Sequence, residues 1–178
     1  MNKKELIIEV ATRLFSENGF EKTSLASIRK EANVSNGLIY HHFKNKNELL
    51  IEIFNRATEI VSDINDSIHD HLTPKQKILM TIEGAFEQME KDKDIFKLYL
   101  NVMLEPTTRM VLHDLIEERN TYLLDSAKKL FAHLPEKEQN IKSYLFVSDL
   151  DGIAINYIFS YKNYPLDLVK EEFTKRYT

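Results

Sequence analysis

Apolar residues recur at spacings of three and four along almost the whole chain, and this pattern constrains the fold more than any other feature. Ile7, Val10, Ala11, Leu14 and Phe15 are its first example, because together they occupy one face of a helix. The four prolines fall in connections or at expected helix starts, where a missing backbone N–H is tolerated. We find no convincing strand. The sequence therefore predicts an all-α protein of about nine helices.

The composition excludes several classes of protein. The 178 residues include only four glycines and no cysteine, so neither a disulfide framework nor a cysteine-ligated metal is possible. The first residues carry acidic side chains inside their apolar pattern, unlike a secretory signal. No uninterrupted apolar run approaches the roughly 18 residues of a membrane span. We expect a cytoplasmic protein without a membrane segment and without a cofactor.

Local signals divide the first 47 residues into three helices. Gly19 follows the first helix where a helix stop is usual. Thr23 and Ser24 can cap a short second helix, and Ser35 can cap a short third one. Asn33 stands at the turn between these two short helices, and asparagine tolerates a positive φ. The expected later helices cover approximately residues 45–68, 74–89, 95–104, 106–131, 135–161 and 165–177.

Two short helices joined by a tight turn form a helix-turn-helix, whose second helix can lie in the major groove of DNA. Ile39 and Phe43, four residues apart, would face the core. The residues that the same geometry turns outward are Asn36, Gly37, Tyr40 and His41. This region is also mildly basic, because residues 1–47 carry eight Lys and Arg against five Asp and Glu, whereas the remaining residues are net acidic.

The outward residues suit a surface that meets DNA. Asn36 can donate to and accept from an adenine edge, and Gly37 lets the backbone approach closely. Tyr40, His42 and Lys46 can donate to phosphate oxygens. Lys46 also lies in the first turn of the following helix, whose N-terminus favours an anion.

Residues 11–50 resemble the DNA-binding domain of the TetR family of bacterial transcriptional regulators. The matching features are Ala11, Leu14-Phe15, Gly19-Phe20, Thr23-Ser24, Ile28, Ala32, Val34-Ser35, Gly37, Tyr40, Phe43, Lys46 and Leu49. Two positions depart from the family pattern: Arg29 replaces a usual alanine, and Asn33 replaces a frequent glycine. The segment "LDGIAINYIF" is similar to the penultimate helix of the family.

The resemblance implies a DNA-binding domain at residues 1–47 and an effector-binding and dimerisation domain at residues 48–178. It implies a homodimer that binds a near-palindromic operator and leaves it when a small molecule binds. Asn36 and Gly37 would lie nearest the bases, and we hypothesise that Leu38 meets a thymine methyl group. The candidate DNA-binding residues are Thr23, Ser24, Ser35, Asn36, Gly37, Leu38, Tyr40, His41, His42, Lys44 and Lys46.

The segment "YLFVSDLDGIAINYIFSY" is apolar on nearly all sides, which indicates burial on two faces. The core of one chain uses only one face, so the other is expected to meet a second copy. Together with the last helix, this predicts a four-helix dimer interface. The alternative is a central helix in a monomer.

Candidate effector-binding residues are the aromatic, methionine and amide side chains of the later helices. They are Phe86, Met89, Phe96, Tyr99, Met103, Tyr122 and Asn156. Such side chains can line an apolar pocket, but each could equally belong to the core. No buried basic cluster is evident in the sequence, which favours a neutral or apolar effector.

Three rival interpretations remain at this stage. Adjacent His41 and His42 do not face one point on a helix, so a metal site is disfavoured. An enzyme built around Asp149, Asp151 and His113 lacks an accompanying nucleophile or phosphate loop. An effector-independent architectural or division-control protein would use the same DNA-binding domain. The interpretation that we favour is a dimeric repressor released by an effector.

Overall fold

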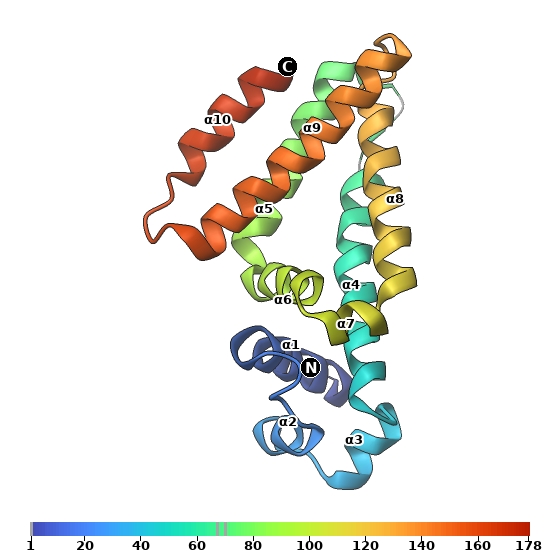
Figure 1. Cartoon of the computed structure of the whole chain (residues 1–178), viewed down its shortest axis with the longest axis vertical. Helices are drawn as coiled ribbons and strands as arrows, with labels where there is room; N and C mark the ends of the chain where they lie inside the picture. Colours follow the sequence, from blue (N-terminus) through green and yellow to red (C-terminus); the bar gives the residue numbers. More distant parts are fainter. Residues whose placement is uncertain (1, 67, 70) are drawn as a thin grey trace. The chain divides into compact units, whose positions relative to one another are not determined.

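The computed structural model describes residues 2–66, 68–69 and 71–178, and Figure 1 shows their arrangement. Within these ranges the secondary structure consists of ten α-helices and one π-helical turn, without a strand. The all-α prediction is confirmed. No helix within the same ranges is long and apolar enough to cross a membrane.

The helices are short at the N-terminus and longer afterwards. Their bounds are α1 (Lys3–Asn18), α2 (Leu25–Glu31), α3 (Asn36–His42), α4 (Lys46–Asp66), α5 (Pro74–Lys91), α6 (Lys93–Leu104), α7 (Pro106–Val111), α8 (His113–Leu130), α9 (Glu136–Ile155) and α10 (Leu166–Tyr177). The π-helical turn η1 (Asn156–Ser160) directly continues α9.

The chain forms two compact units. The first contains the residues up to Thr58 together with Asp94–Leu115, and the second contains Glu59–Lys93 and Ile116–Thr178. Helix α4 contributes to both units, because the division falls between Thr58 and Glu59 within it. This geometric division does not address the functional boundary expected after residue 47, which stays a prediction.

The expected caps are present at several helix ends. The Ser24 hydroxyl accepts the Ser27 N–H, and the Ser35 hydroxyl accepts the Leu38 N–H. Thr73 and Gln76 form a reciprocal capping box before α5. The φ angles of Gly19 and Asn33 are positive, at 83° and 47°. These agreements show that short-range sequence signals set most of the helix boundaries.

The prediction of a single helix over residues 106–131 is wrong, because Leu112 separates α7 from α8. Its φ and ψ of −108° and 11° leave the helical region. Leu112 is fully buried, and the buried Thr108 hydroxyl donates to the Val102 carbonyl of α6 over 3.0 Å. Tertiary packing therefore sets the break, at a position without a glycine or proline.

The helix expected over residues 135–161 also changes character near its end. After Ile155 the hydrogen bonds widen to the π spacing of η1. The Asn156 side-chain amide donates to the Gly152 carbonyl over 2.9 Å. This bond helps to satisfy the backbone where the helix changes pitch.

Each unit has its own apolar core. In the first, Phe15, Ile28, Ile39 and Leu49 are almost completely buried. In the second, an aromatic cluster joins α5, α9, α10 and the turn that follows α8. Its members are Phe86, Phe131, Phe146, Phe173 and Tyr177, with ring centroids 4.8 to 6.0 Å apart in the contacting pairs. Such pairs add about 0.5–1.5 kcal/mol each beyond the area that they bury.

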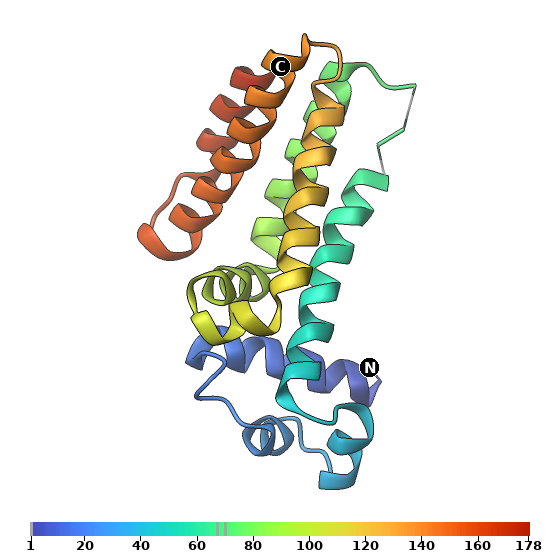
Figure 2. The same ribbon diagram turned by 45° about the vertical axis from the view of Figure 1, so that its right-hand side comes forward.

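Helices α9 and α10 run side by side in both views (Figures 1 and 2). The Tyr177 hydroxyl donates to the Asp149 carboxylate over 2.8 Å, and the Arg176 guanidinium lies 2.9 Å from the same carboxylate. The buried residues of α10 are Leu166, Phe173 and Tyr177, which recur at spacings of seven and four on one face of the helix. The last two helices are thus held as a pair within the second unit.

Candidate nucleic-acid interface and effector region

Helix α3 has one buried face and one exposed polar face. Ile39 and Phe43 are buried, whereas Asn36, Gly37 and His41 are exposed and Tyr40 keeps 52% of its surface accessible. The Ser35 cap fixes where the helix begins and therefore which side chains point outward. The orientation is the one expected from the sequence.

The exposed face of α3 is open near its N-terminus. A Cβ placed on Gly37 would meet no atom within 4 Å, so nothing within the chain requires glycine there. Leu38 is half-buried beside this face. Because Gly37 has no side chain, a binding partner has room to approach the backbone of α3 closely.

The remaining candidates near α3 differ in how far they are free to reach a partner. Ser24 is exposed but serves as the cap of α2. His42 is half-buried, with its ring centroid 5.0 Å from that of His41 and 6.3 Å from that of Phe43. Lys44 is exposed, and its ammonium lies 3.9 Å from the Glu48 carboxylate.

Thr23 and Lys46 are engaged inside the first unit. Thr23 is 3% exposed, and its hydroxyl lies 2.9 Å from the Gly19 carbonyl and 3.2 Å from the Leu14 carbonyl. The Lys46 ammonium donates to the Phe20 carbonyl over 2.7 Å and lies 4.1 Å above the centre of the Phe20 ring. The sequence placed both residues among the DNA-binding candidates, with Lys46 toward phosphate, and gave no signal for these internal partners.

Ion pairs tie α1 to α2 and α4 in the same unit. Arg13 donates to Glu31 over 2.7 Å, and Lys4 donates to Glu52 over 2.8 Å. Arg56 forms a two-pronged pair with Glu5, whose hydrogen bonds hold the pKa of the Glu5 carboxyl below its usual range. These cations therefore hold α1, α2 and α4 together within the unit that contains α3. Arg29, the unusual residue of α2, is half-buried.

The seven candidate effector residues are divided between the two units. Phe96, Tyr99 and Met103 lie half-buried on α6 in the first unit, where the Tyr99 ring is 6.1 Å from that of Phe54. Phe86 and Met89 are buried on α5 in the second unit. Phe86 contacts Phe173 in the aromatic cluster. A shared effector-binding role for the seven stays a prediction.

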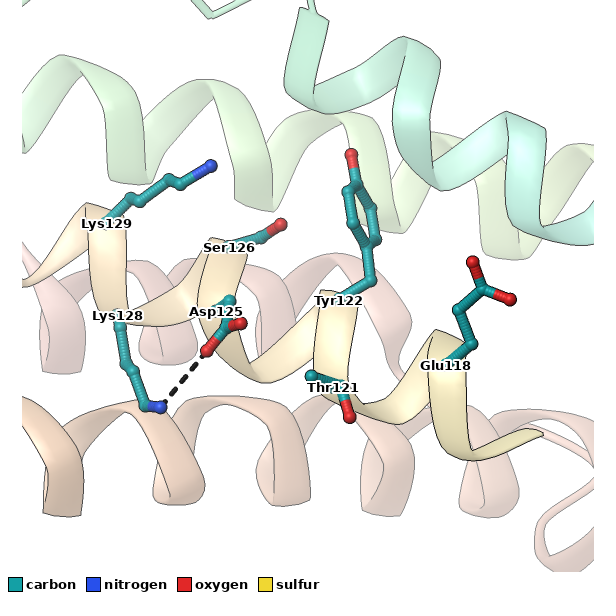
Figure 3. A pocket seen from close by; sticks show the side chains of 7 residues that line it. All are labelled: Glu118, Thr121, Tyr122, Asp125, Ser126, Lys128 and Lys129. Carbon is teal, nitrogen blue, oxygen red and sulfur yellow. Dashed lines mark hydrogen bonds and ion pairs between the residues drawn. The ribbon is translucent and has the colours of Figure 1, made fainter. Parts of the chain in front are cut away.

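Tyr122 lines a hollow of about 660 Å³ on α8 (Figure 3). Glu118, Tyr122 and Ser126 project to one side of the helix, as their spacing of four requires. On α4, the Asn65 amide donates to the Tyr122 hydroxyl and to the Ser126 hydroxyl, each over 3.0 Å. Sequence reasoning missed Asn65 and Ser126, since polar residues near a helix end usually face solvent.

A second hollow, of about 570 Å³, runs between α9 and α10 and includes Asn156. Beside it, α9 exposes the large apolar residues Ile141, Tyr144, Leu145 and Ile155. Leu168 of α10 is 62% exposed. A Cβ on Gly152 would meet nothing within 4 Å, so this part of α9 is free to receive another surface.

The residues of the enzyme alternative are divided between the two compact units. His113 pairs with its neighbour Asp114 over 3.1 Å in the first unit, whereas Asp149 and Asp151 belong to the second. Burial raises the pKa of the Tyr177 phenol, and so does the hydrogen bond that this phenol donates to Asp149. Burial raises the pKa of Asp151, and the charge of Arg119 partly opposes this. Arg119 is 8% exposed, a buried cation that the sequence did not reveal.

Residues 7–53 match the sequence model described as "Bacterial regulatory proteins, tetR family". A curated relative, the fatty acid metabolism regulator protein of Bacillus subtilis (strain 168), is 30% identical over 90 residues. That alignment covers 50% of this chain and 46% of the relative, so the chain spans about half of its length.

Solved structures match over nearly the whole chain. A transcriptional regulator of the TerR/AcrR family from Aquifex aeolicus VF5 has a TM-score of 0.79 at 25% identity, covering 98% of this chain and 97% of that one. The regulator FadR from Bacillus subtilis, in complex with stearoyl-CoA, has a TM-score of 0.80 at 19% identity, covering 96% and 95%. Residues 7–53 therefore form a DNA-binding domain of the tetR family of bacterial regulatory proteins, and the whole chain shares its fold with solved transcriptional regulators.

Proposed function

We propose that the chain is a DNA-binding transcriptional regulator that acts as a homodimeric repressor. The observation that carries this proposal is the exposed polar face of α3, presented by a helix whose other face is anchored by Ile39 and Phe43. A rigid short helix with outward polar residues suits insertion into the major groove. The names of the relatives, which are regulators, favour this class over an enzyme.

Within the interface, Asn36 and Gly37 lie nearest the base edges, with Leu38 beside them. Asn36 hydrogen-bonds an adenine edge, and the bare backbone of Gly37 allows close approach. The contacts to phosphate come from exposed groups around α3, among them Ser35, Tyr40, His41 and Lys44. Because phosphate contacts release counterions, the affinity for DNA falls steeply with salt.

The apolar face of α9 supports a dimer. Tyr144 and Leu145 are exposed in the middle of this helix, and Leu168 is exposed on the adjacent α10. A second copy covers them by packing its own α9 and α10 against this pair, which completes a four-helix interface. Two α3 helices then meet two half-sites of a near-palindromic operator one helical turn apart.

The effector is a small apolar or neutral molecule, with acyl compounds as the first class to test. The FadR neighbour holds stearoyl-CoA, whose acyl chain, unlike its charged CoA group, has the apolar chemistry proposed here. The later helices of this chain are rich in aromatic and methionine side chains, which can line a pocket for such a chain. Binding acts through α4, which contributes to both compact units. A shift of α4 changes the spacing of the two recognition helices and releases the operator.

In vitro selection of double-stranded DNA on the purified protein, at near-physiological salt, tests this function. Enrichment of a palindrome whose binding weakens when acyl compounds are added supports the effector-released regulator. Enrichment of a site that no metabolite weakens moves the assignment to an architectural or division-control protein. A folded protein that enriches no sequence contradicts the regulator proposal.

A further inference from the structure

Gly84 lies in the interior of α5, where glycine is the least favourable residue after proline. Its backbone φ is not positive, so no left-handed conformation requires a glycine at this position. A glycine inside a helix then indicates either a close packing contact or a functional role. The reason for Gly84 is therefore to be found in what occupies the space of its missing side chain.

Ile64 of α4 occupies that space. A Cβ placed on Gly84 would lie 3.0 Å from Ile64 Cγ2, 3.2 Å from Cγ1 and 3.5 Å from Cδ1. Both γ branches of Ile64 thus pack on the glycine, and the restricted χ1 of a β-branched residue does not let both turn away. Any side chain at position 84 would therefore push the α4 backbone away from α5. Both residues belong to the second unit.

The next residue of α4, Asn65, is held by a different helix. Its amide donates to the hydroxyls of Tyr122 and Ser126 of α8, which project to one side of that helix (Figure 3). Consecutive residues of an α-helix point about 100° apart, so Ile64 and Asn65 present two faces of the same turn. The last turns of α4 are thus fixed against α5 by close packing at Gly84 and against α8 by hydrogen bonds.

We propose that Gly84 and Asn65 are positioning residues that hold the last turns of α4 in the orientation required for operator binding. The same helix begins at Lys46, shortly after α3 ends at His42, so a displacement of α4 changes how α3 is presented. A side chain at position 84 would then shift α4 as the effector does. The DNA part of this inference rests on the function proposed above, whereas the contact with Ile64 stands on the geometry of the second unit alone.

Thermal unfolding of Gly84→Ala without DNA, at one protein concentration, tests the contact. In a helix without a close neighbour, this substitution would raise Tm by about 3 °C through helix propensity. Against Ile64 it should instead lower Tm by about 4 °C. In an Ile64→Ala background, which removes the three atoms nearest the added Cβ, the same substitution should raise Tm by about 3 °C. A rise in both backgrounds would overturn the contact.

The affinity of the folded variants for the selected palindrome tests the positioning role. Gly84→Ala should bind this duplex about tenfold more weakly than wild type, a typical size for coupling between sites. Its affinity for a scrambled duplex should stay within about twofold, because no cationic contact to phosphate is removed. Adding Ile64→Ala should bring the affinity for the palindrome back toward that of wild type. A folded Gly84→Ala protein with wild-type affinity would contradict the positioning role, even if its Tm falls.

Asn65→Ala keeps the proposal testable if Gly84→Ala does not fold. It removes the bridge to α8 and should weaken binding to the palindrome about fivefold, with little change for the scrambled duplex. Thr121→Ala, at an exposed position of α8, is the control and should leave both affinities unchanged. Wild-type affinity of Asn65→Ala for the palindrome would overturn its positioning role. If wild type enriches no palindrome, the proposed function fails, and the Tm values still decide whether Gly84 packs against Ile64.

Discussion

Helices α3 and α9 present opposite kinds of surface. In α3 the apolar residues are buried within the chain and the exposed residues are polar or small, apart from Tyr40. In α9 the buried residues include Phe146 and Ile153, yet Tyr144 and Leu145 are also large, apolar and exposed. The chain itself buries the apolar face of α3, whereas it leaves large apolar side chains of α9 exposed.

The difference indicates what each surface is suited to bind. An exposed polar face beside basic side chains suits a hydrated, charged partner such as DNA. An exposed apolar stripe, continued by Leu168 on α10, suits a surface that excludes water. In the proposed dimer, a second copy would supply such a surface with matching chemistry.

The largest expected effect comes from a charge on the α9 stripe. Tyr144→Glu would bury an unpaired carboxylate in the dimer, and we expect the dimer dissociation constant to rise about a thousandfold. Sedimentation velocity over a concentration series measures it. Thr121→Glu, which adds the same charge to an exposed site on α8, is the control and should leave the dimer intact. A Tyr144→Glu protein as dimeric as wild type would show that α9 is not the interface.

The next effect concerns the buried face of α3. Ile39→Ala removes a side chain that is 1% exposed and should lower the free energy of unfolding by about 3 kcal/mol. Denaturant unfolding measures the loss. His41→Ala, on the exposed face of the same helix, should change it by less than about 0.5 kcal/mol. If both variants lose the same free energy of unfolding, the two faces of α3 do not differ in their contribution to stability.

A smaller effect is expected at the start of α3. Ser35→Ala removes the hydroxyl that accepts the Leu38 N–H and should cost about 1 kcal/mol of stability. Ser35→Asp should retain most of the stability, because aspartate also caps helices and favours their N-termini. Thermal unfolding of the three proteins under one buffer condition compares them. If Ser35→Ala is as stable as wild type, another group fixes the start of the helix.

The smallest expected effect concerns the inner face of α9, where Tyr177 donates to Asp149. Burial and this hydrogen bond raise the pKa of Tyr177 in the folded state. The stabilisation is therefore complete below the unfolded pKa of about 10 and is lost as the pH rises through the folded pKa. Wild type should lose more stability than Tyr177→Phe between about pH 8 and pH 11, as measured by denaturant unfolding. If wild type and Tyr177→Phe lose the same stability over this pH range, ionisation of the Tyr177 phenol does not weaken a stabilising contact with Asp149.

Features that depend on a few neighbouring residues were predictable from the sequence. The Ser35 cap, the Thr73–Gln76 capping box and the positive φ of Asn33 each follow from local chemistry. The buried and exposed faces of α3 follow from the spacing of Ile39 and Phe43. The exposed apolar residues of α9 also agree with its all-round apolar pattern.

Features set by distant residues were not predictable. The break at Leu112 depends on packing between α7 and α6, and the bridge from Asn65 to Tyr122 joins residues 57 positions apart. The ammonium of Lys46 finds its carbonyl partner 26 positions earlier in the chain. A lysine near a recognition helix suggests phosphate by its charge, and only the fold reveals its contacts with the loop.

The stoichiometry of the complex with the selected duplex tests the central claim most directly. Native mass spectrometry should find two chains on each palindromic duplex, and scrambling one half-site should weaken binding by about a hundredfold or more. That result would support one complex in which α3 binds DNA and α9 forms the dimer contact. One chain per duplex, or equal affinity for the intact and half-scrambled sites, would contradict the account.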